Sequence, residues 1–215
     1  MLLCILALNT GWFVIYAAAL GFDGAVASDP TTVSRVFREG AWVANSSLAL
    51  HMMAGAVLTI GAPLQAIPIV RYRWNPVHQR VGYVLVSLAL VTGVSGFIYI
   101  LAEGTIGGPW MSLWFSLYGA AMVVSAVQVW RTARLGAFQR HFEWATRLVI
   151  LAVGSWIYRM HYASWYGLTD GAASNRAFTG LFDQVQVVAF FVPYLVVAEV
   201  LLWRARRRHV RYVSV

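Results

Sequence analysis

Long apolar segments separated by short polar connections run along the whole chain. A helix that crosses the hydrocarbon core of a bilayer needs roughly 20 mostly apolar residues. Six segments meet this requirement, and each is too long and too continuously apolar for a barrel strand. The pattern predicts an all-α polytopic membrane helix bundle, one integral membrane domain over residues 1–215, with transmembrane spans at about 2–20, 47–70, 77–102, 110–131, 142–168 and 182–203.

The connections carry residues that typically begin or end helices. Asn75-Pro76 predicts an N-cap followed by proline at the first helical position, and Gly136 predicts the end of the fourth span. Asp29-Pro30 predicts a short helix over about 30–39, lying on the outer membrane surface with an apolar face of Val33, Val36 and Phe37. Ala25-Val26-Ala27 resembles a signal-peptidase site, but no basic region precedes it, so an uncleaved first span is expected.

Composition supports a membrane protein over soluble classes. Hydrophobic residues make up 60% of the 215 residues, charged residues only 11%, and the mean hydropathy is +0.67. These values exclude a water-soluble enzyme and a disordered chain. Because the arginines lie between apolar segments, the net charge of +8 indicates membrane orientation and lipid contact, not nucleic-acid binding. The single cysteine, Cys4, excludes an internal disulfide and any cysteine-ligated metal cluster.

The distribution of arginine orients the chain. The face with Arg35, Arg38 and Arg176 also has six acidic residues. The opposite face has a basic tail over residues 204–215 and carries Arg71, Arg73, Arg80, Arg131, Arg134, Arg140, Arg147, Arg204, Arg206, Arg207, Arg208 and Arg211. By the positive-inside rule this face and both termini are cytoplasmic. The expected location is the bacterial inner membrane, crossed several times.

Four histidines lie at membrane depth, where ionisable residues are costly and mostly functional. His51 and His161 fall near the outer ends of spans two and five, whereas His78 and His141 fall in the first cytoplasmic turns of spans three and five. Each side of the membrane therefore has two histidines on different helices, which is what ligation of a haem iron by two histidines requires. The sequence predicts one or two b-type haems with His78, His141, His51 and His161 as iron ligands.

Span five limits this prediction. Its two histidines are about 30 Å apart along the helix and lie on nearly opposite faces. The inner pair, His78 with His141, is therefore favoured over the outer pair. The alternative is that the histidines only cap interfacial contacts or bind lipid phosphates. Small residues follow His51 and His78 along their helices, either as room for a flat ligand or as packing seams.

Other polar residues inside the spans extend the candidate site. Arg159 is too deep to reach the surface easily, and it suits a haem propionate, a quinone headgroup or an acidic partner such as Asp170 or Asp183. Arg147 could neutralise a propionate. Glu199 could pair with an inner arginine or relay protons, and Gln65 shares a face of span two with His51.

Three blocks of sequence resemble a bacterial membrane family known as domain of unknown function 2306. They are the segment from His51 to Gln65, the segment Asn75-Pro-Val-His78-Gln-Arg-Val-Gly82-Tyr83, and the segment Gln139-Arg-His141-Phe-Glu-Trp144-Ala-Thr-Arg147. Arg159, Pro193 and Glu199 also match, and the resemblance covers roughly residues 48–202. The family is similar in helical layout to the cytochrome b561-like di-haem proteins, which implies b haems and transmembrane electron transfer. Those proteins take one ligand from the fourth span, which here has no histidine.

Three functions follow from these observations. The first is a membrane b-type cytochrome-like protein that carries electrons across or within the bilayer and could act as a quinol- or small-reductant-linked transmembrane oxidoreductase. The second is a non-catalytic integral subunit of a larger respiratory or photosynthetic complex. The third is a small-solute or proton-linked carrier that uses Gln65, Arg159 and Glu199, although the broken-helix pairs typical of carriers are missing apart from Pro63 and Pro68.

Overall fold

The computed structural model describes residues 2–213, with side chains described over residues 10–207. Arg208, His209 and Arg211 of the basic tail are outside the described side chains. The described chain is helical and contains no strand, as predicted. Its elements are α1 (Leu2–Val26), the short 3-10 helix η1 (Pro30–Thr32), α2 (Trp42–Ala66), α3 (Pro68–Tyr72), α4 (Asn75–Glu103), α5 (Gly108–Arg134), α6 (Phe138–Thr169), α7 (Leu181–Ala189) and α8 (Val192–Val213).

Four helical stretches are long and apolar enough to cross a membrane: Trp42–Ala66, Asn75–Glu103, Gly108–Arg134 and Leu181–Arg207. The described part of α1, Thr10–Val26, is a shorter apolar helix. The longest helix, α6, is not among the four, because charged and polar residues such as Arg147, Arg159 and His161 lower its mean hydropathy. The protein is therefore an all-helical membrane protein, and the six spans stay a prediction.

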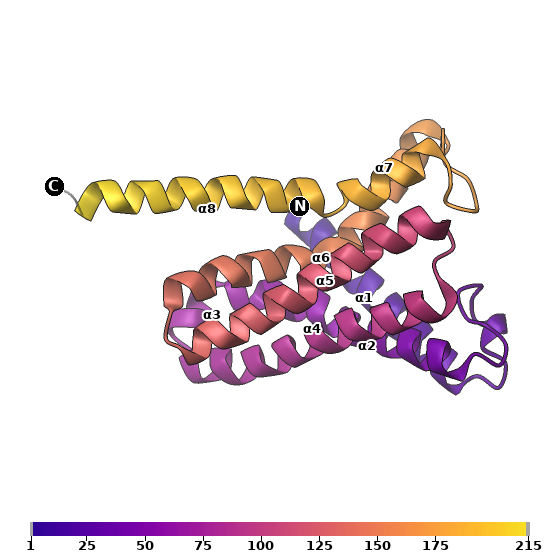
Figure 1. Ribbon diagram of the computed structural model, residues 1–215, viewed down its shortest axis with the longest axis horizontal. Coiled ribbons are helices and arrows are strands. Elements are labelled where there is room, and N and C mark those ends of the chain that lie inside the picture. Colours follow the sequence, from indigo (N-terminus) through magenta and orange to yellow (C-terminus); the bar gives the residue numbers. More distant parts are fainter. Residues whose placement is uncertain (1, 214–215) are drawn as a thin grey trace.

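The helices run roughly along one long axis (Figure 1). The core is built where α2, α4, α5 and α6 pack against one another, and α1 lies against α2. Small side chains such as Ala89 and Ala126 are fully buried beside Leu58 and Leu151, so the helices approach closely. The segment α3, the α5–α6 connection and the C-terminal end of α8 lie at one end of the bundle, which carries most of the arginines.

Prolines interrupt two of the six predicted spans. Span two, expected over 47–70, begins earlier and ends at Ala66, because Ile67 before Pro68 takes an extended conformation (ψ 127°). Span six, expected over 182–203, is divided into α7 and α8. Pro193 has no N–H for the carbonyl of Ala189, the last residue of α7, so the helix breaks there.

The break before Pro193 places two aromatic rings in the core. Phe190 and Phe191 are buried, and their rings contact Tyr118 at centroid distances of 4.9 and 5.3 Å. The junction between α7 and α8 is therefore anchored in the bundle, and α8 runs out from this point beside α6 (Figure 1).

The ends of α4 and α5 agree closely with their sequence signals. The N-cap of α4 is Trp74, one residue before the predicted Asn75, and the Asn75 side chain accepts a hydrogen bond from Gln79 Nε2 at 2.8 Å. Gly136 follows the last turn of α5 with φ +64°, a left-handed conformation that favours glycine.

The predicted surface helix over 30–39 is wrong. Asp29 caps only the 3-10 turn Pro30–Thr32, accepting a hydrogen bond from the Thr31 amide. The segment then turns inward, and the Phe37 ring is buried against Gly24 of α1. Tyr99 of α4 holds it by donating to the Val36 carbonyl at 2.6 Å. Burial of an aromatic ring is worth more than exposure of an amphipathic helix at the surface, which explains the difference.

Candidate functional site

The structure brings the inner histidines together. His78 in the first turn of α4 and His141 in the first turn of α6 have ring centroids 6.5 Å apart, with ring planes at 86°. A metal held by two imidazole nitrogens at about 2 Å each separates the ring centroids by roughly 6 Å. The distance between the two ring centroids is therefore compatible with two ligands on one metal.

The tautomer of His141 is fixed by the backbone. Its Nδ1 lies 3.1 Å from the carbonyl oxygen of Val129 on α5, and because a carbonyl can only accept, Nδ1 carries the proton and donates it. The other ring nitrogen, Nε2, is then an acceptor that can bind a metal. A hydrogen bond from the non-ligating nitrogen is the usual support for a histidine ligand.

Three buried polar atoms near this end of the bundle have no hydrogen-bond partner. They are Nδ1 of His78, Nε of Arg71 on α3, and Oε1 of Gln65 near the end of α2. Arg71 interacts electrostatically with His78, and its guanidinium carbon lies 5.6 Å from the ring centroid of Phe142, next to His141. Buried polar groups are normally satisfied by protein, water or a ligand. The inner histidine site, defined here as His78, His141 and Arg71, therefore has polar groups that a ligand could satisfy.

The set of donors limits which metal group fits. Across the described residues, no group of three or more histidines, cysteines or acids gathers in a way that could hold a metal ion. A structural zinc site needs four protein ligands and a catalytic one needs three. Haem needs only two axial ligands from the protein, because the macrocycle supplies the other four. Two protein ligands are therefore sufficient in number for haem but too few for a zinc site.

The outer histidine His51 lies in a small central pocket. The pocket has a volume of about 70 Å³ and is lined mainly by α1, α2, α5 and α6, with Arg159, Ser155, Tyr118 and Thr92 among its polar residues. His51 Nδ1 donates to the Thr92 carbonyl at 2.8 Å. Gly96 lies against the same ring, since a Cβ atom there would be 2.9 Å from Nδ1. The pocket has room for a few water molecules but not for a macrocycle.

Arg159 contacts this pocket without an acidic partner among the described residues. One guanidinium nitrogen donates to the Ser155 carbonyl at 3.2 Å, and the guanidinium carbon lies 4.8 Å from the centroid of the Phe13 ring. The carboxylate of Asp183 is committed elsewhere, to hydrogen bonds from Tyr162, Ser174, Asn175 and Gly180. Asp183 is thus not the acidic partner of Arg159 that the sequence suggested.

His161 has partners at both ring nitrogens. Nδ1 lies 3.1 Å from Oε1 of Gln186 on α7, and Nε2 lies 2.8 Å from the hydroxyl of Tyr194 on α8. The rings of His161 and Tyr194 are also stacked, with centroids 6.0 Å apart. In this arrangement His161 joins α6 to α7 and α8. A haem between His51 and His161 stays a prediction from sequence.

Glu199 is paired with Arg147. The Arg147 guanidinium donates to both carboxylate oxygens, Nε to Oε1 at 2.5 Å and Nη2 to Oε2 at 2.9 Å. The same guanidinium lies 4.5 Å from the ring centroid of Trp144. Both candidates, Arg147 and Glu199, are therefore part of the contact between α6 and α8.

Sequence reasoning missed the partners of the histidines on other helices. The Thr92 carbonyl, the Val129 carbonyl, the Gln186 amide and the Tyr194 hydroxyl are hydrogen-bond partners of His51, His141 and His161, and Arg71 interacts electrostatically with His78. Arg71 was counted only for orientation. Its position three residues after Pro68, in the short helix α3 that leads the chain to α4, is the signal that could have singled it out.

Comparison with known proteins gives one match. A family model described as "Predicted membrane protein (DUF2306)" matches residues 48–202. This range contains all four histidines, Arg147, Arg159 and Glu199. No curated protein and no solved structure matches the chain.

Proposed function

The chain belongs to the DUF2306 family of predicted membrane proteins, and on that premise we propose that it is a b-type cytochrome-like electron carrier with one haem held by His78 and His141. The observation that carries the proposal is the spacing of the two rings, 6.5 Å between centroids on helices that are far apart in the sequence. Two further observations support it: the Val129 carbonyl orients His141, and Nδ1 of His78 is buried without a partner.

The proposed topology has six spans, with both termini and the inner histidine site on the cytoplasmic side of the bacterial inner membrane. The arginine distribution supports this orientation. The charged helix α6 would be the fifth span, since its 32 residues exceed the length that a bilayer requires. The described part of α1 would belong to the first span.

Each residue of the inner histidine site has its own role in the proposal. Bound haem supplies one-electron transfer. His78 and His141 would hold it from two helices, and the hydrogen bond to Val129 selects the tautomer of the neutral His141 ring in which Nε2 can act as the ligand. Arg71 balances the charge of anionic groups near His78.

A quinol or another small reductant is the proposed electron donor. Arg159 supports this part of the proposal, because it is a cation at membrane depth whose described contacts are a carbonyl and an aromatic ring. Such a group suits an anionic or carbonyl-bearing partner. The donor and acceptor would be found by mixing the reduced or oxidised protein with quinol analogues and following absorbance.

A reduced-minus-oxidised optical spectrum of the purified full-length protein tests the haem proposal. The protein should show a Soret band and α and β bands typical of a six-coordinate b haem. His78→Ala and His141→Ala should each abolish these bands or convert them to a five-coordinate form. His161→Gln is the matched control, because both His161 nitrogens already have protein partners, and it should keep the spectrum.

Two results would reject the proposal. One is a folded protein, produced with haem available, that has no Soret band. The other is a Soret band that persists in both His78→Ala and His141→Ala, which would show that other residues bind the iron. Loss of about half of the haem in His161→Gln or His51→Ala would contradict the single-haem proposal and indicate a second haem at the outer histidines.

A non-catalytic place in a larger membrane complex is the second candidate function, and α8 favours it. This helix faces the bundle with Ala198 and Leu202, while Val196, Val197, Val200 and Leu201 are exposed on its other side. A photo-crosslinker at Leu201 in native membranes should capture a protein partner if this face is an interface. A crosslinker at Leu101 of α4, which is also exposed, is the control.

A further inference from the structure

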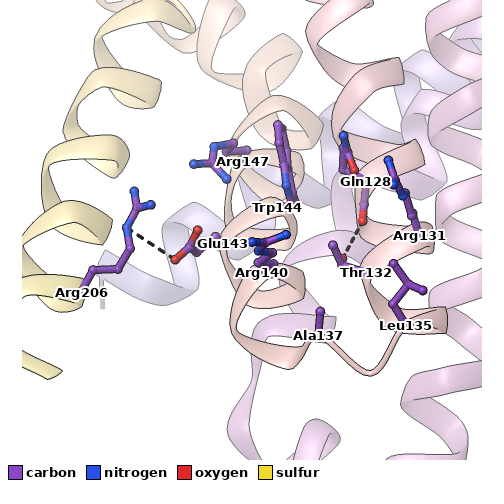
Figure 2. Close-up of a pocket in the computed structure, with 10 residues that line it drawn as sticks. All are labelled: Gln128, Arg131, Thr132, Leu135, Ala137, Arg140, Glu143, Trp144, Arg147 and Arg206. Carbon is purple, nitrogen blue, oxygen red and sulfur yellow. Dashed lines mark hydrogen bonds and ion pairs between the residues drawn. The ribbon is translucent and has the colours of Figure 1, made fainter. Parts of the chain in front are cut away.

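A second, larger pocket lies at the arginine-rich end of the bundle, away from the central pocket. It has a volume of about 410 Å³, within the range of small-molecule sites. Three helices surround it, α5, α6 and α8 (Figure 2). We name it the arginine pocket and define it by its polar lining residues: Gln128, Arg131, Thr132, Arg140, Glu143, Arg147 and Arg206.

Helical periodicity builds two walls of the arginine pocket. Gln128, Arg131, Thr132 and Leu135 share one face of α5, and Arg140, Glu143, Trp144 and Arg147 share one face of α6. Both sets follow the spacing i, i+3, i+4, i+7, which aligns side chains along a helix. The α5–α6 connection makes the two helices antiparallel neighbours, so the two faces meet beside the turn. Arg206 closes the pocket from α8 (Figure 2).

The lining has four arginines against one glutamate. Arg206 pairs with Glu143 at 3.6 Å, and Arg147 pairs with Glu199 just outside the lining. Neither Arg131 nor Arg140 has a carboxylate within ion-pair distance among the residues whose side chains are described. The pocket therefore keeps an excess of two positive charges after its internal pairs are formed, on two exposed arginines that an anionic ligand can reach.

The position and the remaining walls indicate the kind of anion. The pocket lies at the predicted cytoplasmic membrane surface, where anionic phospholipid headgroups concentrate. Trp144, Leu135 and Ala137 give it an apolar side next to the arginines. Trp203 and Arg207 continue this combination on α8, with the Arg207 guanidinium 3.8 Å from the Trp203 ring centroid. A phosphate group attached to an apolar body matches both features.

We propose that the arginine pocket binds the phosphate headgroup of an anionic phospholipid, with Arg131 and Arg140 as the residues that contact the phosphate. Bound there, the lipid bridges the α5–α6 turn to α8. This inference is independent of haem, because none of its residues is a proposed iron ligand. A soluble phosphate ester shares the same chemistry, and the experiment separates the two sources.

Native mass spectrometry of the delipidated full-length protein tests the proposal with three probes: phosphatidylglycerol, phosphatidylcholine and glycerol 3-phosphate. Phosphatidylglycerol should bind at one saturable site at least about tenfold more tightly than phosphatidylcholine, and glycerol 3-phosphate should not compete at equal concentration. The double variant Arg131→Gln/Arg140→Gln should weaken phosphatidylglycerol binding by roughly 10- to 30-fold, given the contribution of an arginine near an anionic surface.

A matched control separates the pocket from general surface charge. Arg73→Gln/Arg80→Gln removes two arginines from the same membrane face, outside the pocket lining, and should change binding by less than about twofold. Circular dichroism confirms that both double variants are folded, and Arg131→Lys/Arg140→Lys should restore part of the affinity. Equal losses in the two double variants would overturn the proposal. Tight binding of glycerol 3-phosphate that displaces the lipid would overturn the lipid assignment in favour of a soluble phosphate ester.

Discussion

Arg147 on α6 and Glu199 on α8 form a two-point ion pair, with both carboxylate oxygens bound by one guanidinium. The second ionic contact of α8, Arg206 with Glu143, is longer at 3.6 Å, and Ala198 and Leu202 of the same helix are buried against the bundle. The pair therefore helps to hold α8 beside α6. Two charged hydrogen bonds in this setting are worth more than an ordinary exposed salt bridge.

Glu199→Gln should loosen α8. We expect a loss of about 1–3 kcal/mol in the free energy of unfolding, because one charged hydrogen bond is lost and the other is weakened. The measurement is the apparent midpoint of thermal unfolding in detergent. The control is Glu103→Gln, whose ion pair with Arg38 is single and 3.7 Å long, so its midpoint should hardly change. Equal shifts in both variants would show that the two-point geometry adds nothing.

Asp183 should be the most sensitive acidic residue of the outer connection. Its side chain is fully buried and accepts hydrogen bonds from the Tyr162 and Ser174 hydroxyls, both at 2.7 Å, and from the Asn175 and Gly180 amides. Asp183→Ala leaves four donors unsatisfied and should destabilise the protein by roughly 3–5 kcal/mol.

Asp170→Asn provides the comparison for Asp183. Asp170 ends α6 with φ 52°, a left-handed conformation that asparagine also accepts. The unfolding midpoint of the Asp170→Asn variant should stay close to that of the wild type. Limited proteolysis of the α6–α7 connection gives an independent measurement: cleavage should become faster in Asp183→Ala alone. Unchanged proteolysis would mean that Asp183 does not organise this connection.

Gly24→Ala should destabilise the contact between α1 and the segment before α2. A Cβ atom at this position would lie 2.0 Å from the Phe37 ring, which is buried and cannot move away freely. We expect a loss of about 1–3 kcal/mol from overpacking. The double variant Gly24→Ala/Phe37→Ala should lose less than the sum of the two single variants, because the residues are in contact.

Gly11→Ala is the matched control in the same helix. A Cβ atom there would meet nothing within 4 Å, and alanine favours a helix over glycine by roughly 1 kcal/mol. The unfolding midpoint of this variant should be equal to or above that of the wild type. If Gly24→Ala behaves in the same way, the inward turn at Phe37 is incorrect.

Added imidazole should restore the haem spectrum of a variant that lacks the His141 side chain. His141→Gly removes the side chain that Val129 orients, and free imidazole can occupy the space and bind the iron in its place. The Soret and α bands lost in His141→Gly should return as imidazole is titrated. Ala145→Gly, one turn further along α6, should keep its spectrum without imidazole. A folded His141→Gly protein whose spectrum equals that of the wild type would contradict the proposed ligation.

The sequence predicted the helices well and their contacts only in part. Hydrophobic runs located the helices, and Gly136 marked the end of α5 within two residues. The sequence favours the inner pair over the outer pair because His141 and His161 lie on nearly opposite faces of span five, and the structure places the inner rings together. The position of a residue along its helix gives its expected depth in the membrane and the helix face on which it lies. These two properties were sufficient to predict that His78 and His141 lie close together.

The same reasoning could not determine what each face contacts. His161 meets Gln186 and Tyr194 because Pro193 breaks the last span, and a continuous helix would place Tyr194 elsewhere. Phe37 turned inward because Gly24 leaves space on another helix. Both outcomes depend on pairs of distant residues, and a single sequence without related sequences does not reveal such pairs.

The break before Pro193 has a consequence for how the last helix is aimed. A continuous helix inherits its tilt from the turn before it, whereas α8 starts at a pivot held by Phe190 and Phe191. Its course is set instead at the far end, where Arg147 and Arg206 meet their carboxylates. The angle of this helix is thus encoded in a few charges near the cytoplasmic surface, and relatives that keep the proline but exchange these charges should point it in a different direction.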